Sequence, residues 1–165
     1  MSLGLPRCMF PWREMTQEER EDIPHPRAEL QFHVATKTSQ LGAGLGLVVV
    51  GPLVGGLRGK SFQGALQGGL RGGRIGLVVG FLTGPLLVEL AMRGKEEEQI
   101  YDRALRIRYN QGQMRTDRFF FSGALGGLAL GGLALGGLLG PGLLGGAVLG
   151  GLGGCLGAGL TNKRQ

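Results

Sequence analysis

The apolar residues of this chain are gathered in long uncharged stretches, and the charged residues lie between them. The uncharged stretches are residues 38–57, 75–88 and 119–162. A helix needs about 20 mostly apolar residues to cross a bilayer, and the third stretch holds two such helices if Gly140-Pro141-Gly142 breaks it. The pattern therefore predicts an all-α integral membrane protein with about four spans, at about 39–57, 75–92, 119–139 and 142–160. A re-entrant hairpin over 119–160 is the alternative to two full crossings there.

Glycines recur at every fourth position through the second predicted span. They are Gly64, Gly68, Gly72, Gly76, Gly80 and Gly84. In an α-helix this spacing places all six on one face. Each costs about 1 kcal/mol of helix propensity relative to alanine, but in a bilayer a face without side chains lets two helices pack closely. We expect one long helix over 62–92 whose glycine face, a glycine zipper, packs against another helix. The same spacing occurs at Gly42 and Gly46 in the first span and at Gly123 and Gly127 in the third.

The polar segments divide the rest of the chain. Residues 1–37 are expected to form a polar N-terminal tail with a short helix that opens at Pro26 and runs on into the first span. Residues 38–160 form the predicted membrane domain, and 161–165 a basic C-terminal tail. Residues 96–111 predict an amphipathic connector helix, because its acidic residues precede its basic ones in the order that the helix dipole favours.

The connector and the residues after it carry side chains suited to a protein partner or to lipid headgroups. These are Tyr101, Arg103, Arg106, Arg108 and Arg115. Arg and Tyr are enriched at interface hot spots, whereas basic residues beside a membrane are also attracted to lipid phosphates. A docking helix and a solvated linker both remain open. Asp102 and Arg106 are expected to pair, since they lie four residues apart.

The composition limits which classes of partner we expect. Glycine makes up 35 of 165 residues, and its neighbours are Leu, Val and Ala, as in membrane helices with small-residue interfaces. The net charge is +6, but the basic residues flank the apolar stretches and are not interleaved with aromatic residues. We therefore expect no nucleic acid as a partner. The expected partners are membrane lipids and other membrane subunits, or a second copy. The two cysteines provide neither a disulfide framework nor metal-ligand spacing.

The sequence predicts no catalytic centre, cofactor or metal, and therefore no enzyme. His25 and His33 lie in a polar segment, and we expect both to face solvent. Glu89 is the only acid inside a predicted span. A proton or substrate role is one hypothesis for it, and an ion pair with Arg93, four residues later, is the favoured one.

The layout of four glycine-rich spans, a long second helix and a charged connector resembles the preprotein-and-amino-acid-transporter superfamily. Its members usually carry an arginine, an aspartate four residues later, and then a small residue and two glycines four apart. Ser122-Gly123 and Gly127 match the glycine end of that motif, and Asp117 precedes it. Asp117 lies two residues closer to the glycines than in the family pattern, and Gln113 occupies the arginine position.

This superfamily includes channel-type subunits of mitochondrial inner-membrane protein translocases and a membrane accessory subunit of respiratory complex I. The resemblance implies a non-enzymatic, multi-pass subunit that serves as a scaffold or channel-like component of a mitochondrial inner-membrane complex. The alternative is a self-associating glycine-zipper protein that forms pores or shapes another membrane, such as the endoplasmic reticulum.

Overall fold

The structure, a computed structural model, describes residues 16–134 and 141–160. Within these ranges every regular element is a helix, and no strand occurs. The elements are α1 (Gln17–Glu21), α2 (Pro26–Leu45), the π-helical turn η2 (Gly46–Val50), α3 (Gly51–Gly59), α4 (Phe62–Met92), α5 (Glu97–Tyr109), α6 (Gln111–Ala134) and α7 (Pro141–Leu160). The predicted all-α fold class is thus confirmed for the part of the chain that is described.

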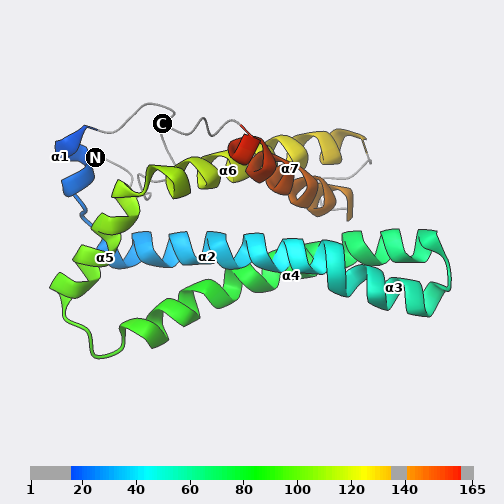
Figure 1. The fold of residues 1–165 in the computed structure, drawn as a ribbon, viewed down its shortest axis with the longest axis horizontal. Coiled ribbons are helices and arrows are strands. Elements are labelled where there is room, and N and C mark those ends of the chain that lie inside the picture. Colours follow the sequence, from blue (N-terminus) through cyan, green and yellow to red (C-terminus); the bar gives the residue numbers. More distant parts are fainter. Residues whose placement is uncertain (1–15, 135–140, 161–165) are drawn as a thin grey trace.

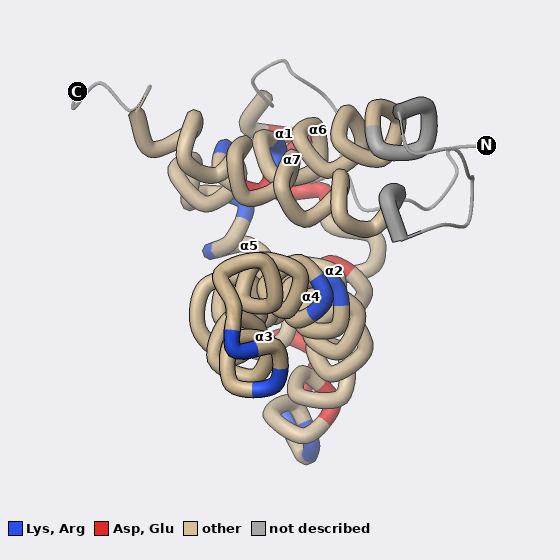
Figure 2. Tube along the Cα trace, turned by 90° about the vertical axis from the view of Figure 1, so that its right-hand side faces the viewer, with Lys and Arg blue, Asp and Glu red and all other residues tan. Residues whose placement is uncertain are grey.

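The helices form two hairpins stacked on each other. The continuous rod α2–η2–α3 turns back into α4, and α6 turns back into α7 (Figure 1). Figure 2 shows α6 and α7 as a layer beside the bundle of α2, α3 and α4. The turn between α3 and α4 lies at one end of the first hairpin, and α5 crosses its other end (Figure 1).

Glycines hold the first hairpin together. All six glycines of the zipper lie on the α4 face that meets α2, η2 and α3. A methyl group added to Gly76 would collide with the carbonyl oxygen of Gly42, and one added to Gly72 with that of Gly46. Near the α5 end, where α2 carries threonine, Thr38 Oγ1 donates a 2.5 Å hydrogen bond to the Gly80 carbonyl. The two backbones therefore touch along the length of the hairpin.

The π-helical turn keeps the facing glycines of the first rod in register. Gly42 and Gly46 are four residues apart, but Gly51 follows Gly46 by five. In an α-helix a five-residue step would rotate Gly51 by about 140° from Gly46, compared with about 40° for a four-residue step. The wider turn, closed by a hydrogen bond from the Gly51 N–H to the Gly46 carbonyl, accommodates the extra residue. Gly51 consequently faces Gly68.

Helix boundaries agree with expectation in the first half of the chain. The long helix predicted over 62–92 is confirmed, with Ser61 capping it through a 3.1 Å hydrogen bond from the Gly64 N–H. The helix that opens at Pro26 continues into the apolar stretch as predicted. Placing residues 23–37 in a tail was wrong, because Ile23 and Leu30 belong to a buried cluster with residues of α4 and α5.

Boundaries in the second half needed correction. The connector helix spans 97–109, close to the predicted 96–111, but α6 starts at Gln111 and so begins eight residues before the predicted third span. Asn110, with φ −83° and ψ 82°, makes the only break between the two helices. The fourth predicted span corresponds to α7, which begins at Pro141, where its missing N–H is tolerated. Residues 135–139 of the predicted third span lie outside the described residues.

Two of the described helices are long and apolar enough to cross a membrane. They are the rod 26–59, with a mean hydropathy of 1.7 over its most apolar window, and α4, with 2.0. Only 17% and 22% of those windows are buried. Residues 144–160 form an apolar helix that is shorter. The count of four spans is therefore not established by helix length and composition.

Candidate functional site

The main polar cluster of the described structure lies where α5 and α6 meet α2. One face of α2 carries Glu29, His33, Lys37 and Gln40, at spacings of four, four and three residues. Such spacing aligns side chains along one side of a helix. This polar face is directed toward α5 and α6, and two side chains from those helices, Arg108 and Asp117, are paired with it.

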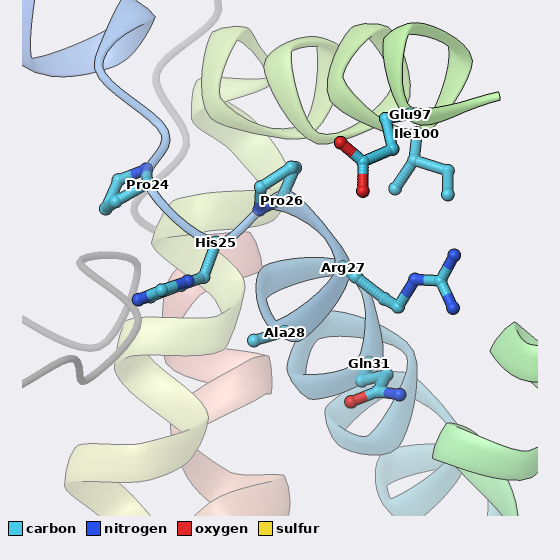
Figure 3. A pocket seen from close by; sticks show the side chains of 8 residues that line it. All are labelled: Pro24, His25, Pro26, Arg27, Ala28, Gln31, Glu97 and Ile100. Carbon is cyan, nitrogen blue, oxygen red and sulfur yellow. The ribbon is translucent and has the colours of Figure 1, made fainter.

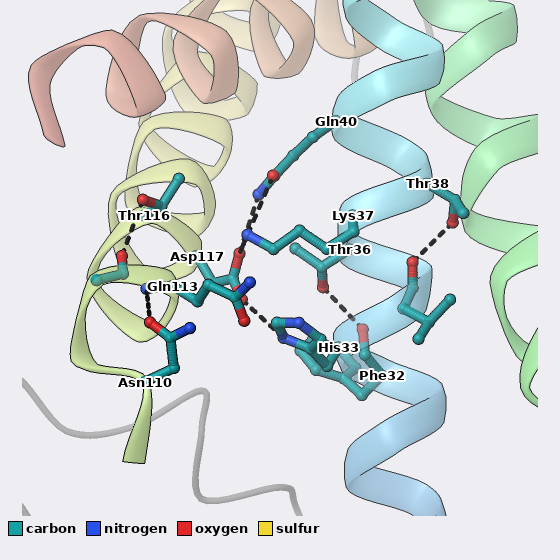
Figure 4. A network of polar contacts seen from close by, with 12 residues as sticks. Phe32, His33, Thr36, Lys37, Thr38, Gln40, Asn110, Gln113, Thr116 and Asp117 are labelled. Carbon is teal, nitrogen blue, oxygen red and sulfur yellow. Dashed lines mark hydrogen bonds and ion pairs between the residues drawn. The ribbon is translucent and has the colours of Figure 1, made fainter. Parts of the chain in front are cut away.

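Asp117 is the centre of the first group of contacts (Figure 4). Its Oδ1 accepts hydrogen bonds from Lys37 Nζ at 2.6 Å and Gln40 Nε2 at 3.1 Å, and its Oδ2 lies 3.1 Å from His33 Nδ1. The Asp117 and His33 side chains are only 10% and 11% exposed. Burial alone raises the pKa of this carboxyl, but hydrogen bonds from His33 and Lys37 outweigh burial and hold the pKa below its usual value. The carboxylate is therefore ionised and neutralised within the helix interface.

Arg108 is the centre of the second group. Its Nε donates to Glu29 Oε2 at 2.8 Å, and its Nη2 contacts the other carboxylate oxygen of Glu29. Its Nη1 donates to the carbonyls of Glu19 at 2.6 Å and Asp22 at 2.8 Å. A buried arginine with a bidentate carboxylate partner is well compensated. Through it, α5 is tied both to α2 and to the chain around α1.

The burial of Arg108 corrects one sequence prediction. Arg108 was expected to face a partner or lipid headgroups, yet its side chain has 0% exposure. The reason is helical periodicity: Ile100, Ala104 and Arg108 are spaced by four residues and share the buried face of α5. An arginine on that face has to find its partners inside the protein.

The other predicted partner residues remain nearer the surface. The Tyr101 hydroxyl donates to the Glu21 carbonyl. Arg103 is exposed. Arg106 pairs with Asp102 at 2.9 Å, which confirms that four-residue pairing. The Arg115 guanidinium carbon lies 5.8 Å from the Phe119 ring centroid. The surface of α5 and early α6 that is open to a partner is thus smaller than the sequence indicates.

Glu89 has different partners from the one expected. Its Oε2 lies 3.4 Å from Arg27 Nη1, and its Oε1 accepts a 2.6 Å hydrogen bond from Gln31 Nε2. The favoured pairing with Arg93 was wrong. Because α2 and α4 are antiparallel neighbours, the last turns of α4 meet the first turns of α2, and Glu89 binds across the helix interface.

The sequence interpretation missed the role of His33, which was expected to face solvent. The signal was available in the four-residue spacing of Glu29, His33 and Lys37, which places three ionisable side chains on one side of the helix. The glycines predicted for packing in the second hairpin, Gly123 and Gly127, lie against the carbonyls of Gly150 and Gly146. No group of three or more metal-ligating side chains occurs among the described residues.

Comparison with known protein families gives a match over most of the chain. The sequence profile of a family described as "Protein of unknown function (DUF1757)" matches residues 10–156. No curated protein matches the chain.

Proposed function

We propose that the chain, which belongs to the DUF1757 family of proteins of unknown function, is a non-enzymatic multi-pass membrane protein that acts as a scaffold subunit of a larger membrane complex. One observation carries this proposal. Most large apolar side chains of α2, α3 and α4 point outward, while glycine lines the contact between the helices of the hairpin. Leu41, Leu82 and Leu90, for example, are 66%, 64% and 69% exposed.

That arrangement suits lipid better than water. In water, extensive exposed apolar surface marks an interaction site or an aggregation hazard, and glycines inside a helix hairpin provide little apolar burial to stabilise it. In a bilayer the outer leucines meet acyl chains, and close backbone contact supplies the packing that holds helices together. The rod 26–59 and α4 are each long enough to span the hydrocarbon layer.

The second hairpin supports a scaffold role. It lies against the first through Gly73 and Val148, and its α6 is joined to α2 by the buried contacts of Asp117. Paired charges inside a helix interface fix how the helices dock. A displaced α6 would leave the buried Asp117 carboxylate and the partly buried Lys37 ammonium without their ion-pair partners. The protein would then present a defined outer surface to neighbouring subunits.

The mitochondrial inner membrane is the location we propose, and it rests on the resemblance of the motif around Asp117, Gly123 and Gly127 to the translocase superfamily. The same resemblance supports a second form of the proposal, in which the chain is a channel-like component of the complex. A transport assay would detect that activity.

Alkaline carbonate extraction of cell membranes tests the membrane proposal. We expect the full chain to remain in the pellet, in the fraction that contains inner-membrane markers after mitochondria are separated. Release into the supernatant would overturn the membrane proposal, and co-fractionation with endoplasmic reticulum would overturn only the location.

Native gels test the subunit proposal. The double substitution Gly76→Leu and Gly80→Leu should dismantle the hairpin and remove the protein from its complex, while Gly44→Leu, where a side chain meets open space, should not. A wild-type protein that migrates only as itself, and that leaks solutes from liposomes as a homo-oligomer, would favour the self-associating alternative instead.

A further inference from the structure

A pocket of about 450 Å³ opens where the chain before α2, the first turns of α2 and the first turns of α5 meet (Figure 3). Its walls combine apolar side chains with polar ones. They include Pro24, Pro26 and Ile100 on the apolar side, and Arg27, Gln31 and Glu97 on the polar side. This volume falls in the range of small-ligand sites.

The two charges in the pocket have binding capacity to spare. Arg27 has five N–H donors, and its contact with Glu89 is a single one of 3.4 Å. The Glu97 carboxylate makes no side-chain hydrogen bond or ion pair with any residue in the described part of the chain. In Figure 3 the Arg27 and Gln31 side chains extend from α2 on the side where Glu97 and Ile100 lie. The pocket therefore presents cationic donors and a free carboxylate acceptor close together.

This pairing of charges selects the ligand. A simple anion would approach Arg27 but would also meet Glu97 and the nearby Glu89, and a simple cation would meet Arg27. A ligand that carries a phosphate and an ammonium group satisfies both charges at once. Its ammonium must have N–H donors, because a carboxylate accepts hydrogen bonds from these, whereas a quaternary choline nitrogen offers none.

The position of the pocket indicates where such a ligand comes from. Pro26 begins the first candidate span and Met92 ends the second, and both lie at this end of the hairpin. Beyond Met92 the chain becomes charged, with Arg93 and Lys95. If the hairpin crosses a bilayer, as the proposed function requires, the pocket lies at the level of the headgroups.

We propose that this pocket binds the phosphoethanolamine headgroup of a membrane lipid. Arg27 contacts the phosphate, Glu97 accepts hydrogen bonds from the ammonium group, and Pro24, Pro26 and Ile100 contact the carbon atoms between them. The acyl chains lie along the apolar outer surface of α2 and α4. The lipid as the source of the ligand rests on the proposed membrane function. The match between the pocket and a ligand with phosphate and ammonium groups is independent of it.

Native mass spectrometry of the full chain in detergent tests the inference. The protein is incubated with equal amounts of phosphatidylethanolamine, phosphatidylcholine and phosphatidylglycerol, and the retained lipid is measured. We expect preferential retention of phosphatidylethanolamine. Glu97→Gln leaves a neutral acceptor in place of a charged one. Hydrogen bonds to charged groups contribute about 1.5–3 kcal/mol and neutral ones about 0.5–1.5 kcal/mol, so the preference should fall about tenfold, which corresponds to about 1.4 kcal/mol. The matched control is Glu98→Gln, which removes the neighbouring exposed carboxylate and should leave the preference unchanged.

The remaining variants test the phosphate contact and the source of the ligand. Arg27→Ala should weaken retention of every phospholipid, and Arg27→Lys should restore part of it. Equal retention of the three lipids, or equal loss in Glu97→Gln and Glu98→Gln, would overturn the site. Displacement of lipid by free O-phosphoethanolamine at equal concentration would support the phosphate–ammonium site but overturn the lipid as its source. Because the displacement by free O-phosphoethanolamine needs no bilayer, it distinguishes a wrong ligand assignment for the pocket from a wrong membrane proposal.

Discussion

The contact between α2 and α4 allows a test in which two neighbouring glycines behave oppositely. Gly42 and Gly44 lie two residues apart in α2. A Cβ added at Gly42 would lie 2.8 Å from the carbonyl carbon of Gly76 and 3.3 Å from its Cα, and would collide with its carbonyl oxygen. A Cβ added at Gly44 would have no atom within 4 Å. Gly42→Ala and Gly44→Ala are thus the same chemical change in two different surroundings.

The expected difference follows from packing. Carbon atoms in contact normally lie about 3.5–4.0 Å apart, so the hairpin must open by roughly 1 Å at Gly42 to admit a methyl group. Such a gap forfeits about a quarter to a half of the dispersion attraction between the atoms that it separates, and overpacking of this kind typically costs about 1–3 kcal/mol. The gain in helix propensity on replacing glycine by alanine is about 1 kcal/mol at both positions and cancels in the comparison. We expect Gly42→Ala to be less stable than Gly44→Ala by about 2 kcal/mol.

The assay is thermal stability of the detergent-solubilised full chain. The melting temperature is taken where half of the protein is lost from the monodisperse peak in size-exclusion chromatography. For a chain of this size, about 2 kcal/mol corresponds to a shift on the order of 4–8 °C. Gly44→Ala should melt at or above the wild-type temperature and Gly42→Ala below it. Equal melting temperatures, or a higher one for Gly42→Ala, would refute the close backbone contact.

Three further predictions concern other parts of the fold. Deleting Val49 should leave the melting temperature nearly unchanged, because it converts the π-helical turn to an α-helical one and keeps Gly46 and Gly51 on the same face. Deleting Val54 should instead shift Gly55 off the interface and lower the melting temperature. The pKa of Asp117 in the folded protein lies below the ordinary carboxyl value of 3.8. Its stabilising effect should therefore be complete above pH 3.8 and be lost as the pH falls through the lower folded pKa. We expect the melting temperature of Asp117→Asn to differ from that of the wild type at pH 7, and the difference to shrink as the pH is lowered below 3.8. Arg108→Ala leaves Glu29 buried without its partner and should lower the free energy of unfolding by about 3 kcal/mol or more. Because Arg108 also binds the chain around α1, we expect faster hydrogen exchange in residues 17–23. Unchanged exchange there would contradict the prediction.

Local patterns were sufficient to predict the elements of this protein that depend on neighbours within one helix. The six zipper glycines and the Asp102–Arg106 pair each involve residues a few positions apart, where helix geometry alone sets the spatial relation. For the same reason, the start at Pro26 and the full range of α4 were predictable. The boundary between α5 and α6 was not, because it depends on the backbone angles of the single residue Asn110.

The tertiary structure alone decided which charged residues face one another. The partners of Glu89, Arg108 and Asp117 lie 58 to 89 residues away in the sequence. Helical spacing predicts which residues of α2 share a face, so the polar face through His33 and Lys37 could have been found. It does not predict which helix covers that face, since that depends on how the two hairpins stack. For this reason His33 and Arg108 were assigned to the surface, and only the packed structure shows them as parts of the internal contacts that join the helices.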